Sequence, residues 1–542
     1  MEGDFYLGLD SSTQSLTALV IDFDQKKVVY RNTLIFDEAL SQYGTENGVI
    51  TLKNEKEVHS FPLMWVDALE LMVKFIKKAG IDLSSIKSIA GSGQQHGTVY
   101  LNDRFEKSLQ NLKINQPISE QIDSSLTRRT SPIWMDSSTK AQCKEIREKL
   151  GGSKKTIEIT GSDTFERFSG PQIRKFYQNQ PDRYEQTSTI HLVSSFLASI
   201  LLGKNAPIDY GDGAGMNLMN IKTKNWDRRA LDATAPRLQE KLPELCNSFE
   251  IIGRITSYFS DKYGFSPDTQ LVAWSGDNPN SLVGLGIIEK AKAAISLGTS
   301  DTYFSYLKKL SFDFKGESHV FGAPTGDYMS LICYKNGSIA RERIKKQYDL
   351  TWEKFSEILQ NTPPGNKGKI MLPYFLPEIV PLVLEPKVYR FGLNANDIEG
   401  NVRAIIEAQF LSMRLHSQWI LEKPDQIFAT GGASANREIL QIAADIFQTP
   451  ILRFQVSDSA ALGAALRAVK SYYDLIGKNL NWEDLSHHFL DIQESEVIHP
   501  RKEYKSLYDD MLKLYELYEQ HVISGKKEPK KTHKKFVRKY FE

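Results

Sequence analysis

FYLGLDSSTQSLTALVIDF, residues 5–23, sets the architecture expected for this chain. Two apolar runs, Phe5–Asp10 and Leu16–Phe23, flank the short polar turn Ser11–Ser15. Apolar runs that are rich in β-branched residues and separated by short turns are typical of antiparallel strands. A third run, Val28–Phe36, follows another polar turn. The N-terminal sequence therefore predicts a meander of three antiparallel strands.

The same plan recurs in the second half of the chain. Ala293–Leu297 is apolar, Gly298–Asp301 is a small hydroxyl-rich turn, and Thr302–Leu307 resembles a strand again. The two regions share little sequence identity, but both have the order strand, Ser/Thr/Gly turn, strand. Because helical patterns follow both of them, we expect an α/β protein with two domains built on one template.

The boundary between these domains is expected near Gly264–Asp268, where turn residues precede the apolar run Leu271–Trp274. This gives an N-terminal domain at 1–267, a C-terminal domain at 268–525 and a basic tail at 526–542. Charged chain ends are usually solvated, so the tail is expected to have no dedicated role.

The composition limits the classes of partner. Lys and Arg number 68 against 67 Asp and Glu, and a net charge of +1 gives no electrostatic basis for binding nucleic acid or an anionic membrane. The three cysteines, Cys143, Cys246 and Cys333, are too far apart for a cysteine-rich metal site. The acidic N-terminus lacks a signal-peptide pattern, and the longest apolar stretch, Leu192–Leu202, is short and interrupted by serines. We expect a cytoplasmic monomer or homodimer.

Asp10 ends the first predicted strand and is followed at once by hydroxyl side chains, among them Ser12 and Thr13. Hydroxyls and free backbone N–H groups in such a turn can bind phosphate oxygens, while the carboxylate approaches a metal ion. Asp and Ser are also ordinary hairpin-turn residues. Taken alone, the motif is better interpreted as a structural turn.

Gly276-Asp277-Asn278-Pro279 follows the apolar run Leu271–Trp274. Proline is tolerated in the first turn of a helix, because no intrahelical partner awaits its missing N–H there. Asp277 is therefore expected at the mouth of a strand, where a ligand can reach it. An Asp that merely caps a helix is the alternative, and in isolation it is the favoured one.

Two further turns are rich in glycine. SLGTSDT, residues 296–302, lets the backbone approach an anion closely. ATGGASAN, residues 429–436, places two glycines between a strand and a helix, which offers a flat surface for a nucleotide and N–H donors at the helix start. Each turn is a weak signal by itself, because glycine-rich turns are common.

Several common nucleotide-binding classes are excluded by inspection. GGSKKT at residue 151 has the wrong spacing for a GxxxxGK[ST] loop, and GSGQQHG at residue 91 is not GxGxxG. The sequence has no HRD followed by DFG, which excludes a protein kinase.

The four turns, together with longer motifs, carry a family resemblance. The motifs are SGSGQQHGTVY, PIWMDSST, GSDTFERFSG, PIDYGDGAGMNL, SGDNPNSL and FATGGASANREIL. Over roughly residues 5–525 the chain resembles the FGGY carbohydrate kinases, and within them the eukaryotic type of D-xylulose kinase. The resemblance implies two actin-like, RNase H-like domains of the hexokinase superfold with a cleft between them.

The resemblance also implies roles for individual residues. Asp277 matches the general base, and His96, Arg167 and Asn278 match sugar contacts beside it. Asp10 matches the acid that helps to hold Mg²⁺–ATP. The other nucleotide-side matches are Ser12 and Thr13 in the first phosphate turn, Gly298 and Thr299 in the second, Gly431, Gly432 and Asn436 in the adenosine shelf, and the aromatic Trp352.

The implied reaction is phosphorylation of D-xylulose by ATP, which gives D-xylulose 5-phosphate and ADP. A sugar hydroxyl is a poor nucleophile, and a carboxylate that accepts its proton typically contributes about 10²- to 10⁴-fold. Two alternatives stay open. One is an FGGY kinase for another ketose or polyol, such as ribulose or glycerol. The other is an actin-like ATPase that phosphorylates no sugar, against which the sugar-side matches His96, Arg167 and Asn278 speak.

Overall fold

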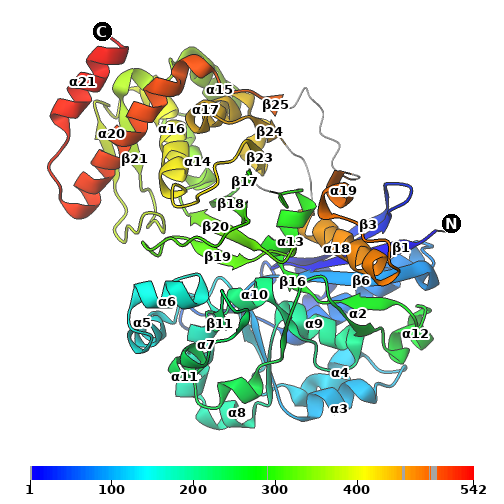
Figure 1. Ribbon diagram of the computed structural model, residues 1–542. Helices are drawn as coiled ribbons and strands as arrows, with labels where there is room; N and C mark the ends of the chain where they lie inside the picture. The colour runs from blue at the N-terminus through cyan, green and yellow to red at the C-terminus, as the bar shows by residue number, and fades with distance from the viewer. Residues whose placement is uncertain (1–2, 290, 454–457, 488, 490–496) are drawn as a thin grey trace.

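The structure is a computed structural model that describes residues 3–289, 291–453, 458–487, 489 and 497–542. The chain forms two lobes, each built around a seven-stranded mixed sheet (Figure 1). The first sheet has the order β14-β15-β6-β1-β2-β3, and β16 also pairs with β6. Its strands are β1 (Phe5–Ser11), β2 (Ser15–Asp22), β3 (Lys27–Ile35), β6 (Ile86–Gly93), β14 (Ile251–Arg254), β15 (Gln270–Val272) and β16 (Ser275–Gly276).

The second sheet has the order β19-β20-β18-β17-β23-β24-β25. Its strands are β17 (Lys292–Leu297), β18 (Asp301–Leu307), β19 (His319–Gly322), β20 (Tyr328–Tyr334), β23 (Gln426–Thr430), β24 (Ile451–Arg453) and β25 (Val497–Ile498). Small sheets add β4 (Ile50–Thr51), β5 (Val58–Ser60), β7 (Thr98–Leu101), β8 (Ser131–Pro132), β9 (Thr189–Leu192), β10 (Ile208–Asp209), β11 (Met219–Asn220), β12 (Asn225–Trp226), β13 (Leu245–Cys246), β21 (Ile370–Pro373) and β22 (Val388–Phe391).

The predicted meander and the predicted repeat are confirmed. β1, β2 and β3 are antiparallel neighbours, and β1 also pairs in parallel with β6. The second sheet repeats this arrangement, because β17 pairs antiparallel with β18 and in parallel with β23. The polar turn after β1 and the hydroxyl-rich turn after β17 therefore occupy equivalent places in the two sheets.

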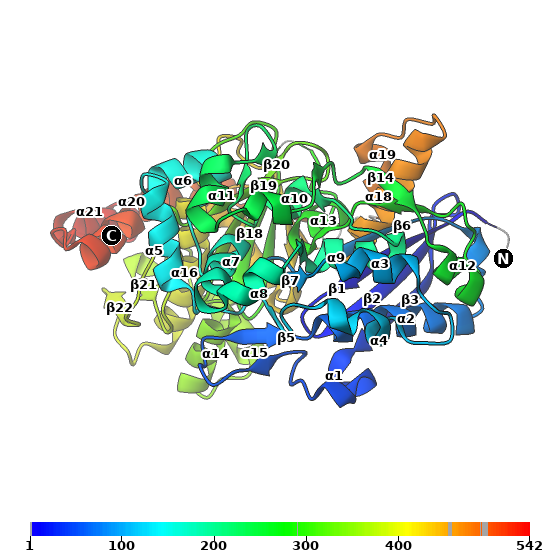
Figure 2. The same cartoon turned by 90° about the horizontal axis from the view of Figure 1, so that it is seen from below.

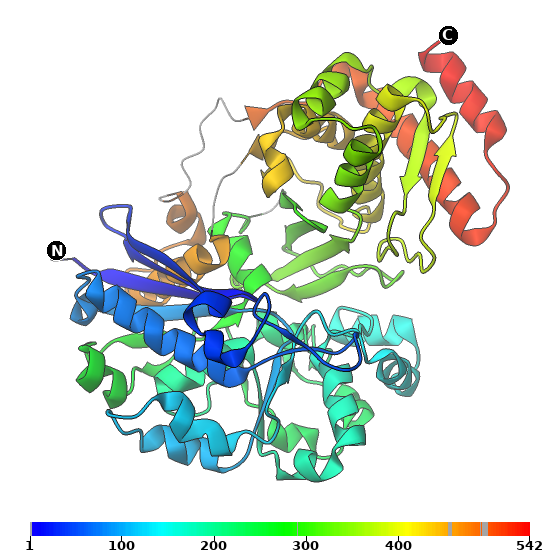
Figure 3. The same cartoon turned by 180° about the vertical axis from the view of Figure 1, so that it is seen from behind.

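Helices pack on both sheets, as the views from below and behind show (Figures 2 and 3). Up to residue 284 they are α1 (Phe36–Ala39), α2 (Pro62–Lys78), α3 (Arg104–Gln110), α4 (Ile118–Ile122), α5 (Lys140–Lys149), α6 (Ser153–Thr160), α7 (Ser169–Asn179), α8 (Pro181–Gln186), α9 (Val193–Leu202), α10 (Tyr210–Ala214), α11 (Arg228–Thr234), α12 (Ser257–Tyr263) and α13 (Asp277–Gly284). Later come α14 (Ser338–Gln347), α15 (Trp352–Asn361), α16 (Ile398–His416), α17 (Arg437–Phe447), α18 (Ser459–Leu475), α19 (Trp482–His487), α20 (Lys505–Ser524) and α21 (Lys530–Tyr540).

The alternation along β1 explains how the first sheet is covered. Phe5, Leu7 and Leu9 face the core that α2 and α9 complete, whereas Tyr6 faces α18 on the opposite side. Gly8 also lies on the α18 side, and a Cβ there would be 2.1 Å from a backbone oxygen of that helix. The glycine therefore permits close packing of a helix from the C-terminal part of the chain against an N-terminal strand.

The sheet pairing extends past the expected domain boundary at 267/268. β15 and β16 follow that position, yet both pair in parallel with β6 in the first sheet. Asp277 thus begins a helix at the edge of the first sheet, although the sequence analysis assigned it to the C-terminal domain. The pairing favours a boundary between α13 and β17.

The expectation of a solvated C-terminal tail is wrong. Residues 530–540 form α21, which packs against α20 at the outer end of the second lobe (Figure 3). Phe536 is 5% exposed, and His533 hydrogen-bonds through Nδ1 to the Tyr518 hydroxyl at 2.6 Å and through Nε2 to the Gly368 oxygen at 2.8 Å. The basic residues belong to an amphipathic helix, in which Phe536 is buried and Val537 and Tyr540 are partly buried.

Of the stretch Leu192–Leu202, Leu192 ends β9 and the rest forms α9, every residue of which is buried in the first lobe. Within the described ranges, none of the helices combines the length and the apolar character that crossing a bilayer requires.

Candidate active site

Asp10 lies near the end of β1, where Thr17 and Ser92 are its neighbours in the sheet. Its side chain is partly exposed, but Oδ1 is buried and has no hydrogen-bond partner. Burial raises the pKa of Asp10 to about 6, with the Ser92 hydroxyl opposing and the charge of Asp458 adding to the rise. A buried carboxylate oxygen without a partner is suited to a cation or a donor supplied by a ligand.

The turn after Asp10 is closed by its own hydroxyls. Ser12 donates from its backbone N–H to the Ser15 oxygen at 2.9 Å, and its Oγ donates to the same oxygen at 3.2 Å. Thr13 Oγ1 accepts a 2.8 Å hydrogen bond from Nε1 of Trp134. Sequence reasoning gave Trp134 no role, although it lies in the quoted motif PIWMDSST.

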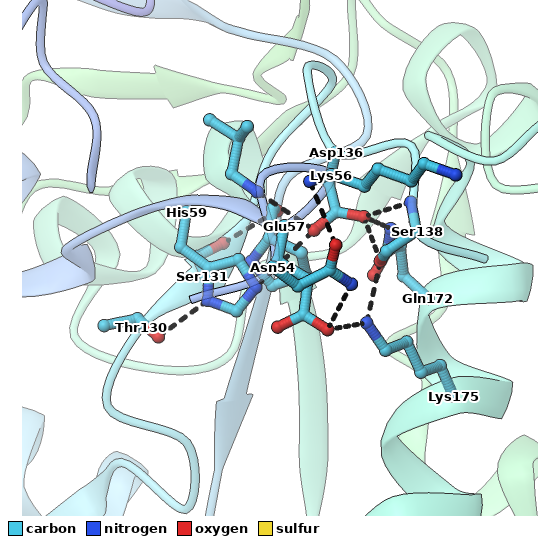
Figure 4. Close-up of polar contacts among 12 residues, drawn as sticks. Asn54, Lys56, Glu57, His59, Thr130, Ser131, Asp136, Ser138, Gln172 and Lys175 are labelled. Atoms are coloured by element: carbon cyan, nitrogen blue, oxygen red, sulfur yellow. Dashed lines mark hydrogen bonds and ion pairs between the residues drawn. The ribbon is translucent and has the colours of Figure 1, made fainter. Parts of the chain in front are cut away.

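Asp136 lies two residues after Trp134, and its polar contacts are drawn in Figure 4. This carboxylate is 1% exposed, and its Oδ1 accepts from the Ser138 N–H at 3.0 Å and from Gln172 Nε2 at 2.7 Å. Its Oδ2 accepts from the Val58 N–H at 3.2 Å. Because these bonds tie the loop to the buried Asp136, Trp134 has a fixed place beside the first turn, where it is 45% exposed.

Asp277 is the first residue of α13, directly after β16. It is partly exposed, and burial of its carboxyl group raises the pKa to about 7. The negative charge of Asp10 adds to the rise, whereas the Asn278 N–H, which donates to Oδ1 at 2.8 Å, opposes it. A carboxyl group with a pKa near neutrality suits a general base.

Asn278 connects Asp277 to a residue that sequence reasoning passed over. Its Nδ2 donates to Asp277 Oδ1 at 2.9 Å and to Gln95 Oε1 at 2.9 Å. Gln95 stands next to His96 in GQQHG, so the glutamine joins the expected base to the expected sugar contact. Gly276 accommodates this arrangement, because a Cβ there would lie 2.5 Å from Gln95 Cγ.

His96 adopts a left-handed backbone conformation with φ of 73° and is 5% exposed. Its Nδ1 lies 3.0 Å from the oxygen of Gly215, a contact in which Nδ1 donates. Burial, with a smaller contribution from the positive charge of Arg167, lowers the pKa of His96 to about 3. The ring is therefore neutral, and Nε2 is left as an acceptor for a ligand hydroxyl.

Arg167 is partly exposed on the loop between α6 and α7. Its Nη2 lies 2.8 Å from Nε2 of His319, the first residue of β19 in the second sheet. Phe168 is 4.6 Å from His96 and 5.0 Å from His319 between ring centroids, so it separates the two histidines. Sequence reasoning did not identify His319.

The second hydroxyl turn follows β17. Thr299 is exposed, and the Gly298 oxygen accepts from the Ser338 N–H at 2.9 Å. Below the turn, Arg341 Nη1 and Nη2 donate to the two carboxylate oxygens of Asp301 at 2.7 and 2.9 Å. Both side chains are 1% exposed, so this buried ion pair fixes the base of the turn.

Gly431 and Gly432, the two glycines after β23, differ in how closely other atoms approach them. Gly431 has φ of 85°, and a Cβ there would lie 2.6 Å from the oxygen of Leu297, the residue before Gly298. Gly432 has no atom within 4 Å of its Cβ position, so its surface is open. This close approach brings the expected adenosine shelf beside the second phosphate turn.

Asn436 caps α17, with Oδ1 accepting from the Glu438 N–H at 3.0 Å. Its Nδ2 donates to Ser356 Oγ at 2.6 Å, and that hydroxyl donates to the Trp352 oxygen at 2.9 Å. Trp352 begins α15 and is 40% exposed. The structure thus joins Asn436 to Trp352, two residues that are far apart in the sequence.

The expected residues form two groups. The first lobe gathers Asp10, Asp277, Asn278, His96 and Arg167, and the second gathers Gly298, Thr299, Gly431, Gly432, Asn436 and Trp352. Among the residues that the structure describes, no hydrogen bond joins Ser12 or Thr13 to Gly298 or Thr299.

Comparison with known proteins agrees with this geometry. Residues 5–284 match the N-terminal domain of the FGGY family of carbohydrate kinases, and residues 293–472 match its C-terminal domain. The chain is 40% identical to a xylulose kinase of Rattus norvegicus over 473 residues, which cover 85% of this chain and 87% of the relative. It is 42% identical to xylulose kinase 2 of Arabidopsis thaliana over 490 residues, 86% of this chain and 87% of the relative.

The fold is also that of a solved structure, a ligand-bound xylulose kinase from Lactobacillus acidophilus. The TM-score is 0.80 at 21% identity, and the match covers 96% of this chain and 99% of the other. On these two domain matches and on the relatives that are 40–42% identical, the chain belongs to the FGGY family of carbohydrate kinases.

Proposed function

We propose that this protein transfers the γ-phosphoryl group of ATP to a hydroxyl of D-xylulose, giving D-xylulose 5-phosphate and ADP. The proposal is supported by relatives named xylulose kinase that are 40–42% identical over most of both chains. The observation that carries the chemistry is Asp277, a partly exposed carboxyl group with a pKa raised to about 7, in the same lobe as the neutral acceptor His96.

Asp277 is proposed as the general base. As the sugar oxygen forms its bond to the γ-phosphorus, the hydroxyl proton passes to a carboxylate oxygen of Asp277, and the bond from that phosphorus to the bridging oxygen of ADP breaks. A pKa near the working pH leaves much of the base ionised while keeping it basic enough to accept the proton. The Asn278 hydrogen bonds at 2.8 and 2.9 Å to Oδ1 orient this carboxylate.

The sugar is proposed to lie against His96, Arg167 and Asn278. The neutral His96 offers Nε2 as an acceptor, and Arg167 offers donors only. A site with fixed polar groups of both kinds rejects sugars that cannot pair with them, because its buried groups are then left without partners.

ATP is proposed to lie between the two hydroxyl turns. Ser12, Thr13, Gly298 and Thr299 would contact the phosphates through N–H and hydroxyl donors. The adenosine would rest on the open face of Gly432 beside Gly431, Asn436 and Trp352. The exposed Trp352 ring and the uncovered Gly432 surface support this placement.

Asp10 is proposed to hold Mg²⁺ together with the phosphates. Among the described residues, no three His, Cys, Asp or Glu side chains are grouped as a complete metal site. Mg²⁺ in kinases typically takes one or two carboxylates, with water and substrate phosphates as its other ligands, and the partnerless buried Oδ1 of Asp10 fits that requirement. When bound, the ion neutralises charge on the phosphates.

An ADP-release assay with a panel of acceptors tests the proposal. We expect ADP release to require D-xylulose, with D-ribulose and glycerol much poorer, and the product to be identified as D-xylulose 5-phosphate by NMR. Equal ADP release without sugar would favour the actin-like ATPase, and preference for ribulose or glycerol would identify another FGGY kinase. The cytoplasmic location and the monomeric or homodimeric state stay predictions from the sequence.

A further inference from the structure

Arg167 is a residue of the proposed sugar site whose side chain is hydrogen-bonded to the other lobe. It is carried by the first lobe, yet its only hydrogen bond among the described residues joins Nη2 to Nε2 of His319 at 2.8 Å. The two residues are 152 positions apart, and His319 belongs to the edge strand β19 of the second sheet.

The acceptor in this contact must be the histidine. A guanidinium has donors only, so Nε2 of His319 accepts and the ring proton sits on Nδ1. His319 is 2% exposed, and burial together with the positive charge of Arg167 lowers its pKa well below the ordinary value. The ring is therefore held in the neutral state that can accept from Arg167.

Aromatic rings fix both partners. The His319 ring lies 4.5 Å from Phe165 in an edge-on contact and 5.7 Å from Phe321 in a stacked one. The Arg167 guanidinium lies 5.4 Å from the ring centre of Phe165 and 5.7 Å from that of Phe168. Rings packed in this way leave little freedom for either side chain.

The backbone beside His319 is also tied to the first lobe. The Val320 N–H donates to the Gly161 oxygen at 3.2 Å, and Gly161 directly follows α6 at the start of the loop that carries Arg167. The imidazole therefore has a fixed place relative to that loop.

Arg167 forms no ion pair with a carboxylate in the part of the chain that the structure describes. A carboxylate in the place of His319 would neutralise the guanidinium while orienting it. A neutral imidazole orients the group and leaves its full positive charge for the bound sugar.

We propose that His319 is a positioning residue of the sugar site, which reaches from the second lobe to aim the Arg167 guanidinium without neutralising it. This inference rests on the proposed function only in taking Arg167 as a sugar contact. It predicts that the apparent affinity for D-xylulose depends on the acceptor atom at position 319 more than on the ring.

His319→Phe is the most direct test, because it keeps an aromatic ring among Phe165, Phe168 and Phe321 but removes the acceptor. We expect KM for D-xylulose to rise about tenfold or more, and KM for ATP to change less than about twofold. His319→Gln restores an acceptor and is expected to stay within about threefold of wild type. If His319→Phe does not fold, His319→Leu serves as the acceptor-free variant.

Combination with Arg167→Met separates positioning from a general loss of packing. If His319 acts through Arg167, adding His319→Phe to Arg167→Met changes KM for D-xylulose by no more than about twofold. His191→Phe is the matched control. His191 is a fully buried histidine that bonds Ser195 and Asn205 away from the site, and its variant is expected to keep the KM values of wild type.

The outcomes distinguish the two proposals. A wild-type protein that turns over no D-xylulose overturns the proposed function. A wild-type protein that uses D-xylulose, with a His319→Phe variant of unchanged KM, overturns the role of His319. A His319→Phe effect that persists in full on the Arg167→Met background also overturns it.

Discussion

Asp10 and Asp277 lie on either side of strand β6 in the first sheet, at the carboxyl end of that strand. Asp10 pairs with Ser92, and Gly276, directly before Asp277, pairs with Gly93. Because β1 and β16 both run parallel to β6, the two carboxyl groups emerge at the same edge. Burial and the charge of Asp10 together raise the pKa of Asp277 to about 7.

This relationship predicts a pH-dependent rate. Asp277 accepts a proton only when it is ionised, so kcat/KM for D-xylulose should fall about tenfold per pH unit below its apparent pKa, near 7. Because the carboxyls interact, that value belongs to the pair. Steady-state rates across the pH range measure it, and Asp10→Asn should lower the apparent pKa in the residual activity. A flat profile through neutrality would contradict the role of Asp277.

Asp277→Asn should separate activity from stability. We expect kcat to fall by at least about 10²-fold, because amide nitrogen and oxygen cannot take the proton. The folded protein retains the Asp277 proton up to about pH 7 whereas the unfolded chain loses it near 3.8, so this group costs stability increasingly as pH rises between those values and most above them.

The Asn variant has no such charge to bury, so its Tm at pH 8 should exceed that of wild type by about 2 °C or more, with little difference near pH 4. The exposed Asp261→Asn is the control and should change neither quantity. A lower Tm at pH 8, measured at matched scan rate, would count against burial of the charge.

Trp134→Phe should weaken the use of ATP. The variant keeps an aromatic ring but loses the 2.8 Å bond that holds Thr13 in the first phosphate turn. We expect KM for ATP to rise about 2- to 10-fold, the cost of one hydrogen bond. Trp226→Phe removes a similar 2.8 Å indole bond, to the Pro243 oxygen, outside the site. Equal effects of the two substitutions on KM would refute a specific role for Trp134.

Phe536→Ala should destabilise the second lobe. Phe536 is 5% exposed where α21 packs, and truncation of a buried Phe typically costs about 3 kcal/mol. We expect a lower Tm, whereas Lys534→Ala on the exposed side of the same helix should stay within about 0.5 kcal/mol of wild type. Identical melting of the two variants would mean that the tail does not contribute to the folded core.

Local patterns accounted for much of the fold. The strand meander after residue 5 and its repeat after Ala293 were predictable because alternation and turn chemistry act over a few residues. The tail helix was not predicted, because its many lysines are typical of a solvated chain end, whereas the apolar spacing of Phe536 and Tyr540 is a weaker pattern. The packing of α18 on β1 could not be predicted. Gly8 is its only local sign, and no short-range pattern indicates which helix packs against a glycine.

The candidate site likewise contains residues that the sequence could identify and residues that it could not. Asp10, His96 and Asp277 stand in motifs through which the sequence resembles its family, although each motif alone is a weak signal. Trp134 and His319 act on residues 121 and 152 positions away, and neither contact has a short-range signature.

The two-domain α/β plan, the hydroxyl turns and the family follow from the sequence, because they depend on residues that are adjacent in the chain. The shared sheet edge of Asp10 and Asp277, and the acceptor that the second lobe supplies to Arg167, emerge only in the folded chain. Side-chain pKa values and orientations depend on burial and on neighbouring charges, which distant segments contribute when they pack together.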